Sequence, residues 1–186
     1  AHSTTTATTV PTLGPSAPAP LGLEPSTREC LAANTTALSA EGIRAENAQP
    51  GTTAWRTALT SATTRVNISL DRGSVQCGGT VAISLRGDTI PAVITVYRLG
   101  WYGGTGGRAV WSSAPIVARP GTVPPPTGPT RTVVLTWPEV AHLTIPPTWT
   151  PGLYAVTAAP ADAPSQTSLA PLVIRADGVP TPLLVM

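Results

Sequence analysis

The sequence lacks phenylalanine and lysine, and charged residues make up only 11% of its 186 positions. Its 11 basic residues are all arginine, lie scattered along the chain and leave a formal net charge of +2. Nucleic-acid binding normally uses a basic stripe with interleaved aromatic residues, so this composition argues against a nucleic-acid partner. There is also no run of 18 or more apolar residues, so we expect no membrane span.

Long stretches free of proline and glycine are rare as well, because 22 prolines and 17 glycines punctuate the chain. This excludes long helices and favours short strands joined by turns. Period-two or continuous apolar patterns mark strands at residues 65–70, 81–86, 91–99, 131–137, 152–158 and 168–175, with a weaker candidate at 108–117. We therefore predict an all-β fold, an immunoglobulin-like antiparallel β-sandwich.

The chain divides into three predicted parts. Residues 1–25 are a Thr-, Pro- and Ala-rich extended tail, residues 26–180 form the sandwich, and residues 181–186 are an apolar end segment. The end segment contains the candidate assembly residues Leu183, Leu184, Val185 and Met186. It must pair with its own sheet, pair with another chain, or begin a domain that is missing here. The proline-rich run 121–129 must be a loop or an edge segment.

One short helical turn is also predicted. Ser26 and Glu29 have the spacing of a capping box, which starts a helix. We expect this turn to end at Ala33, because Asn34, Thr35 and Thr36 follow it.

Cys30 and Cys77 are the two cysteines of the chain, and the chain starts at Ala1 without a methionine, as an exported mature protein does. An even pair in an exported protein predicts a disulfide, with two buried thiols as the alternative. The bond would close a loop of about 47 residues and contribute roughly 4 kcal/mol. We expect a secreted, extracellular or cell-surface protein, with candidate glycosylation sequons at Asn34 and Asn67.

A glycine-rich segment follows the predicted strand 91–99. Residues 104–109 fit the pattern G-x-G-x-x-A, but a dinucleotide site needs a helix next, and a strand-like run follows instead. We interpret the segment as a tight structural loop that folds two aromatic rings back onto the sandwich. Its residues are Tyr97, Arg98, Gly100, Trp101, Tyr102, Gly103, Gly104, Gly106, Gly107 and Arg108. The two arginines are predicted clamps for a carboxylate or for backbone carbonyls.

Groups for catalysis or metal binding do not cluster in the sequence. His2 and His142 are far apart, the acidic residues are scattered singly, and no G-x-S-x-G elbow is present. We therefore predict no catalytic residue, no metal and no cofactor. The rings of Trp55, Trp101, Tyr102, Trp111, Trp137 and Trp149 could form a sugar-stacking platform. Filling or closing the core is the commoner use of such large rings, so carbohydrate binding is an alternative only.

Four motifs occur in a fixed order and carry a family resemblance. They are ENAQPGTTAW at 46–55, VYRLGWYGGTGGR at 96–108, LTIPPTWTPGLY at 143–154 and LVIR at 172–175. Together they resemble the N-terminal β-sandwich region of proteins similar to the large (beta) subunit of N,N-dimethylformamidase, over residues 43–186. The resemblance implies that the amidase chemistry, at an iron site, belongs to a larger α/β domain that follows the sandwich. No iron ligand can be placed on this chain.

Three functions stay open at this point. The first is a structural or assembly subunit, for example of an extracellular filament or surface layer, which self-associates through its terminal segments. The second is an accessory domain of an amidase-like enzyme, positioned against a catalytic domain absent here. The third is a carbohydrate-binding module. The fold alone does not choose among them.

Overall fold

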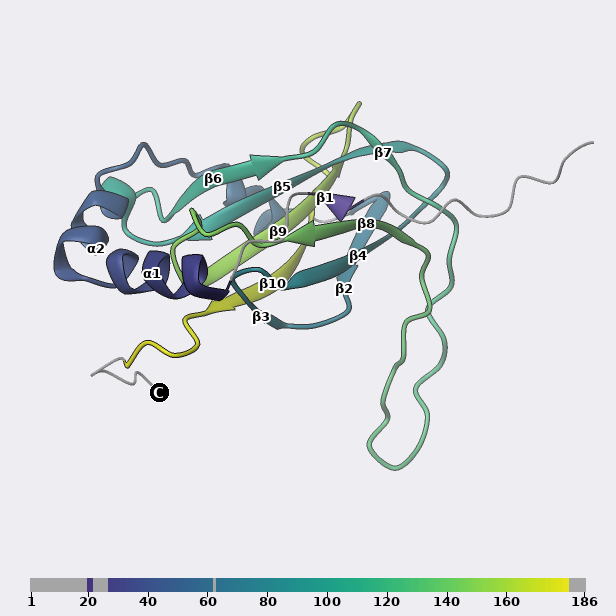
Figure 1. Ribbon diagram of the computed structural model, residues 1–186. Helices are drawn as coiled ribbons and strands as arrows, with labels where there is room; N and C mark the ends of the chain where they lie inside the picture. The colour runs from purple at the N-terminus through teal and green to yellow at the C-terminus, as the bar shows by residue number, and fades with distance from the viewer. Residues whose placement is uncertain (1–19, 22–26, 62, 181–186) are drawn as a thin grey trace, which may run out of the picture.

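A computed structural model describes residues 20–21, 27–61 and 63–180 of the chain (Figure 1). Within them, two sheets face each other as a β-sandwich, which confirms the predicted all-β, immunoglobulin-like class. One sheet has the order β1-β8-β4-β2, and the other has the order β3-β10-β9-β5-β6, with β7 paired to β5. Neighbouring strands run antiparallel except for β1 with β8 and β3 with β10, which are parallel.

The strands are β1 (Pro20–Leu21), β2 (Val66–Leu70), β3 (Ser74–Gln76), β4 (Thr80–Gly87), β5 (Pro91–Leu99), β6 (Gly107–Ser112), β7 (Ile116–Val117), β8 (Glu139–Thr144), β9 (Gly152–Pro160) and β10 (Ser168–Arg175). The helical segments are α1 (Thr27–Ala37), α2 (Ala40–Asn47), η1 (Ala54–Arg56), α3 (Thr57–Thr60) and η2 (Tyr102–Gly104). Five of the six strongly predicted strands are present. The weaker candidate at 108–117 is split into β6 and β7.

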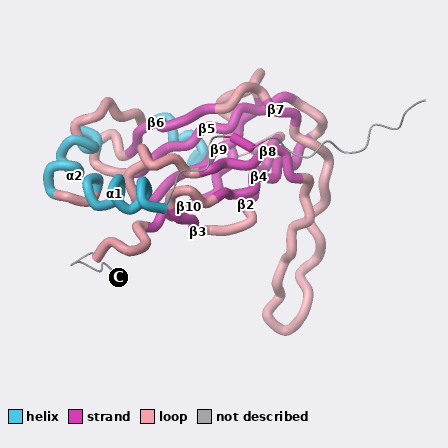
Figure 2. The backbone as a smooth tube through the Cα atoms, viewed as in Figure 1, coloured by secondary structure: helices cyan, strands magenta, loops and turns pink. Residues whose placement is uncertain are grey.

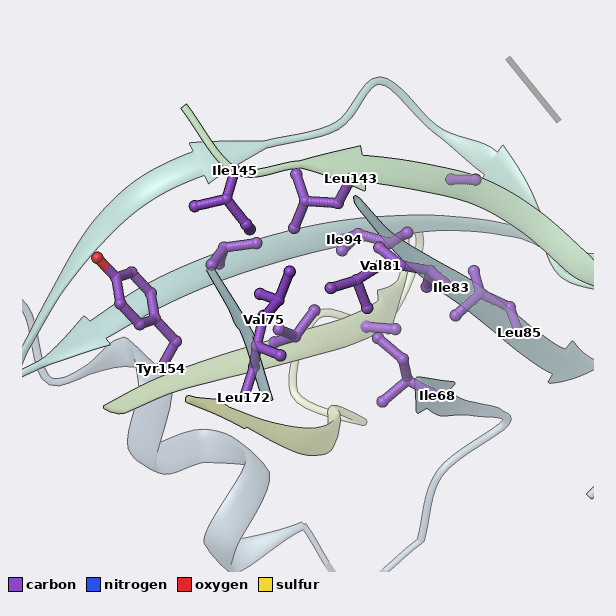
Figure 3. Close-up of a cluster of buried hydrophobic side chains, with 14 of the residues drawn as sticks. Ile68, Val75, Val81, Ile83, Leu85, Ile94, Leu143, Ile145, Tyr154 and Leu172 are labelled. Atoms are coloured by element: carbon purple, nitrogen blue, oxygen red, sulfur yellow. The ribbon is translucent and has the colours of Figure 1, made fainter. Parts of the chain in front are cut away.

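Alternating apolar side chains from both sheets build the core (Figure 3). Ile83 and Leu85 of β4 face Ile94 of β5 and Leu172 of β10, and all four are fully buried. Side chains in a strand alternate between its faces, so every second residue points inward. The period-two pattern of the sequence therefore predicts the buried face of strands such as β2 and the second half of β4, whereas β9 is buried on both faces.

The helix at residues 27–37 is longer than predicted. The hydroxyl groups of Thr35 and Thr36 donate hydrogen bonds to the carbonyl oxygens of Leu31 and Ala32, at 2.8 and 3.1 Å. Those residues therefore continue α1 where we expected its end, because each hydroxyl finds a partner inside the helix. A second helix, α2, was not predicted. Ser39 caps it by accepting a 3.0 Å hydrogen bond from the backbone N–H of Gly42.

The predicted strand at residues 131–137 is wrong. This segment belongs to a loop that leaves the sandwich at the end opposite α1 and α2 and projects from it (Figure 2). A single bridge between Thr127 and Thr132 closes the loop, and no strand of the described chain pairs with residues 133–137. Pro138, which lacks an N–H, separates this run from β8. Apolar side chains exposed on the loop are Val123, Val133, Val134 and Leu135.

A disulfide joins Cys30 of α1 to Cys77 beside β3, as predicted. It fastens a helix whose other buried residue is Asn34, and α2 has no buried residue. The helical hairpin therefore contributes little apolar surface to the core and is held by specific links. None of the helices in the described part of the chain has both the length and the apolarity that a membrane crossing needs.

Several predicted features fall outside the described residues. These are most of the tail at 1–25, the capping residue Ser26, and the end segment with Leu183, Leu184, Val185 and Met186. The described part of the tail is β1, which pairs Pro20 with His142 and Leu21 with Leu143. The three-part division of the chain stays a prediction.

Candidate functional site

The carboxylate of Glu46 lies at the centre of a buried polar cluster, although it stands on the exposed helix α2. Its side chain is only 10% exposed. Arg108 of β6 donates to both carboxylate oxygens, with distances of 2.8 and 3.1 Å from Nη2 and 3.0 Å from Nε. The hydroxyl groups of Tyr102 and Thr150 also donate to it, at 2.5 and 3.2 Å. The carboxylate is therefore fully engaged by its neighbours.

Arg98 of β5 completes this cluster, which we call the Glu46 hub and define as Glu46, Arg98, Tyr102, Arg108 and Thr150. The guanidinium of Arg98 donates to the Tyr102 hydroxyl at 2.9 Å and to the carbonyl oxygens of Thr150 and Pro151 at 3.2 and 3.3 Å. Its Nη1 atom lies 4.0 Å from the Glu46 carboxylate. Both predicted kinds of partner therefore occur: Arg108 binds a carboxylate, and Arg98 binds backbone carbonyl groups.

The hub holds the glycine loop, residues 100–107, against the segment that follows α2. The carbonyl oxygen of Gly107 accepts a 2.7 Å hydrogen bond from the N–H of Thr52, and the indole N–H of Trp55 donates to the carbonyl of Thr105 at 3.3 Å. A Cβ added at Gly107 would lie 2.6 Å from the Trp55 ring, and one at Gly51 would lie 2.0 Å from the Thr105 hydroxyl. Both positions therefore require glycine because the segments touch.

Two neighbouring aromatic residues on this loop have opposite environments. Tyr102 is buried and has a φ of 42°, a strained value for a bulky residue. Trp101, immediately before it, is 68% exposed. The carbonyl oxygen of Trp101 accepts a 2.8 Å hydrogen bond from the N–H of Gly104, so the backbone under the indole is fixed. The loop therefore folds Tyr102 onto the sandwich, as we expected of both rings, but presents Trp101 to solvent.

The hub shifts the pKa values of its acidic members in opposite directions. Burial raises the pKa of Glu46, but hydrogen bonds from Tyr102 and Arg108 and the charges of Arg108 and Arg98 outweigh it, so the pKa lies below its ordinary value. Burial, followed by the hydrogen bond to Glu46, raises the pKa of the Tyr102 phenol. The hub is thus an ionised carboxylate held by two guanidinium groups and a neutral phenol.

This arrangement suits a structural link better than a reaction. A general base needs a lone pair directed at substrate. The oxygens of Glu46 instead accept hydrogen bonds from three donor residues, Arg108, Tyr102 and Thr150, and the guanidinium of Arg98 lies 4.0 Å away. No group of three His, Cys, Asp or Glu side chains that could hold a metal ion occurs among residues 27–61 and 63–180.

The other candidate residues are dispersed over the sandwich. His142 lies on β8, where its Nε2 atom is 3.5 Å from the carboxylate of Glu139. Of the two predicted glycosylation sites, Asn34 is 4% exposed inside α1 and Asn67 is half-buried on β2, and glycosylation of either stays a prediction. The segment with His2 lies outside the described residues.

The tryptophans do not form a shared platform in the described structure. Trp149 is buried and stacks on Tyr154 with ring centroids 5.5 Å apart. Trp55 packs on the glycine loop, Trp111 packs against the core, and the indole N–H of Trp137 donates to the carbonyl oxygen of Thr122. Of these five tryptophans, Trp101 is the one that is mostly exposed. A sugar-stacking surface at Trp101 would therefore have no second exposed indole beside it.

Sequence reasoning missed three contributors to this site. Glu46 and Thr150 stand within the quoted motifs, but nothing in the sequence assigned them to the arginines. Tyr154 donates a 2.6 Å hydrogen bond to the carbonyl oxygen of Thr150 from inside the core, and burial raises its phenol pKa. The sequence did offer one signal, because each of the first three motifs that carry the family resemblance contains at least one residue of the cluster.

Comparison with known protein families gives a match over the second half of the chain. A family model described as N,N-dimethylformamidase beta subunit-like, C-terminal matches residues 93–186, which is half of the chain. The matched region runs from β5 to the end of the sequence and includes every hub residue except Glu46. The description names a C-terminal part, whereas we assigned the resemblance to an N-terminal sandwich region. No curated protein matches the chain.

Replacing Glu46 with glutamine should destabilise the chain. Glu46→Gln removes the negative charge but leaves Arg108 and Arg98 partly buried, which costs about 2–4 kcal/mol of the free energy of unfolding. Urea unfolding monitored by tryptophan fluorescence measures the change. Glu41→Gln, the same substitution at an exposed position of the same helix, is the control and should change stability by less than about 0.5 kcal/mol. Equal effects of the two substitutions would show that the hub does not hold the helix.

The stability that Glu46 contributes should depend on pH. Its pKa is lower in the folded chain than its ordinary value of 4.5, so the contribution is complete above that pH and is lost as the pH falls through the folded pKa. The difference in unfolding free energy between the native chain and Glu46→Gln should therefore be constant near neutral pH and shrink in acid. Urea titrations from neutral pH down to about pH 3 test this. A difference that does not change with pH contradicts the assignment.

Proposed function

This chain belongs to the N,N-dimethylformamidase beta subunit-like, C-terminal family, and from that premise we propose that it is a non-catalytic accessory sandwich that docks on another domain or subunit. The observation that carries the proposal is the exposed Trp101 on the fixed glycine loop. Tryptophan is the residue type most enriched among the anchors of protein interfaces. An anchor that is already fixed loses little conformational entropy on binding, which raises affinity.

The strained backbone of the loop supports a recognition role. Tyr102 is held at a positive φ by the hub, and Trp101 is the residue next to it. A conformation that costs about 1–3 kcal/mol persists only where surrounding contacts determine it, and such positions gather at binding sites. A hub that served only to join α2 to the sandwich would not need the adjacent indole in solvent. The proposed partner is the catalytic α/β domain that the family resemblance implies.

We also propose that the chain acts outside the cytoplasm. The disulfide between Cys30 and Cys77 supports this, because disulfides form and persist mainly in oxidising compartments.

Replacing Trp101 with alanine should weaken docking without unfolding the sandwich. Trp101→Ala removes an exposed ring, so thermal stability should change by less than about 0.5 kcal/mol. Affinity for a separately purified α/β catalytic region from a protein of this family should fall at least tenfold, as expected for an interface anchor. Isothermal titration calorimetry measures this affinity for the native chain and for Trp101→Ala. Leu59→Ala, which truncates a 64% exposed residue on α3, is the control. A variant that binds like the native chain would overturn this docking role.

A second candidate function is self-assembly through the N-terminal tail, and β1 favours it. Two tail residues, Pro20 and Leu21, already occupy the edge of the sheet beside β8. An edge that accepts a strand from its own tail can accept the same strand from another copy, which links subunits.

Deleting residues 1–25 should then convert any polymer into monomers. The deletion removes β1 and the segment before it, while the core residues of β4, β5 and β9 remain. Light scattering after size exclusion, with negative-stain images, compares the deleted and complete chains, and circular dichroism checks that the sandwich persists. A complete chain that is monomeric, or a deleted chain that still assembles, would remove this candidate.

A further inference from the structure

The described structure contains a cavity of about 380 Å³ between α1, the turn after β3 and the turn after β10. Its lining residues are Thr27, Cys30, Leu31, Asn34, Gln76, Cys77, Gly78, Gly79, Asp177 and Gly178. The disulfide forms part of the wall, so we call it the disulfide cavity. It lies apart from the Glu46 hub, because none of the hub residues lines it.

Asn34 is the unusual residue of this cavity. It is 4% exposed, yet its side-chain amide makes no hydrogen bond to any residue that the structure describes. Its polar atoms are not sealed inside protein, because no fully enclosed and unpaired side-chain polar atom occurs among the described residues. The amide therefore opens onto the cavity. A ligand that replaces water as the partner of this amide gains a net hydrogen bond of about 0.5–1.5 kcal/mol.

The chemistry of the lining selects a neutral ligand with both polar and apolar parts. An asparagine amide donates and accepts, which matches the N–H and C=O of a peptide group. Leu31 is 44% exposed at the cavity and offers an apolar contact beside the disulfide. Asp177 is the one charged residue of the lining, and its carboxylate already accepts from Arg175 at 3.2 and 3.1 Å. An extended apolar peptide fits this set better than an ion does.

The chain itself supplies such a peptide at this place. After β10, a turn in which the N–H of Val179 donates to the carbonyl of Ala176 reverses the chain, with Gly178 at a φ of 81°. Gly178 passes so close to Leu31 that an added Cβ would lie 3.4 Å from its Cδ1 atom. The chain therefore leaves the sandwich over the cavity. Residues 183–186, which read Leu-Leu-Val-Met, begin five positions later, within a reach of up to about 17 Å.

We propose that residues 183–186 of the same chain bind in the disulfide cavity, with their peptide groups paired to the Asn34 amide and an apolar side chain against Leu31. The short connection from Gly178 gives this segment a high effective concentration at the cavity. Residues 22–26, which precede Thr27 in the sequence, contain one large apolar residue, Leu23, against four in residues 183–186. This inference does not depend on Trp101 docking.

The direction in which Asn34→Ala changes the melting temperature of the complete chain tests the proposal. If the cavity holds only water, Asn34→Ala should leave the melting temperature unchanged or raise it, because alanine is the better helix former and an amide paired with water adds little net stability. If the segment is bound, Asn34→Ala should lower the melting temperature by about 3 °C or more. Asn47→Ala, the same substitution on α2, reports the effect of helix propensity alone. A rise or no change for Asn34→Ala overturns the proposal.

A double-mutant cycle and a direct contact measurement identify the occupant. Leu183→Ser with Leu184→Ser should lower the melting temperature in the native background and have little further effect in Asn34→Ala. Nuclear Overhauser contacts between the Asn34 amide and the methyl groups of residues 183–185 should appear within one molecule. Additive effects, contacts to Leu23, or contacts that appear only between differently labelled molecules would each overturn binding of the chain's own end segment.

Discussion

A buried carboxylate must be paired, and the packing at one end of this molecule follows from that requirement. Glu46 stands on a helix that buries no residue of its own, yet its side chain is 10% exposed. Arg108, Tyr102 and Thr150 reach it from β6, the glycine loop and the connection before β9. Removing any one donor would leave charge or polarity unpaired in a partly dry site. The position of α2 and the path of the loop are therefore coupled.

The disulfide performs the corresponding task at α1. That helix buries Cys30 and Asn34, and Asn34 faces a cavity, so apolar packing alone offers α1 little to hold it. A covalent link between Cys30 and Cys77 acts mainly by restricting the unfolded chain and does not require apolar area in the folded one. The α1–α2 hairpin is thus attached by one covalent and one ionic link, whereas the sandwich is held by its core. Reductant would break the disulfide and acid would weaken the ion pair, so both should loosen the hairpin. The apolar core of the sandwich depends on neither link.

The sequence predicted the sandwich because strands bury alternate residues, and that alternation is local information. Val81, Ile83 and Leu85 show it, and all three are fully buried. The same rule failed for residues 131–137, because alternation does not reveal whether a neighbouring strand exists to pair with the segment. It also failed to identify the hub. That Glu46 meets Arg108 across 62 positions depends on how α2 folds back, and no local pattern encodes such a contact.

The hub is better understood as a positioning device than as a source of stability. Apolar residues of similar volume often stabilise a protein as much as a buried ion pair does, because the pair must first be dehydrated. What apolar packing lacks is direction. The guanidinium of Arg98 reaches Tyr102, Thr150 and Pro151 at once, and each contact fixes an angle. Such a network can hold Tyr102 in a strained conformation and keep Trp101 in solvent, which is an arrangement that apolar burial would oppose.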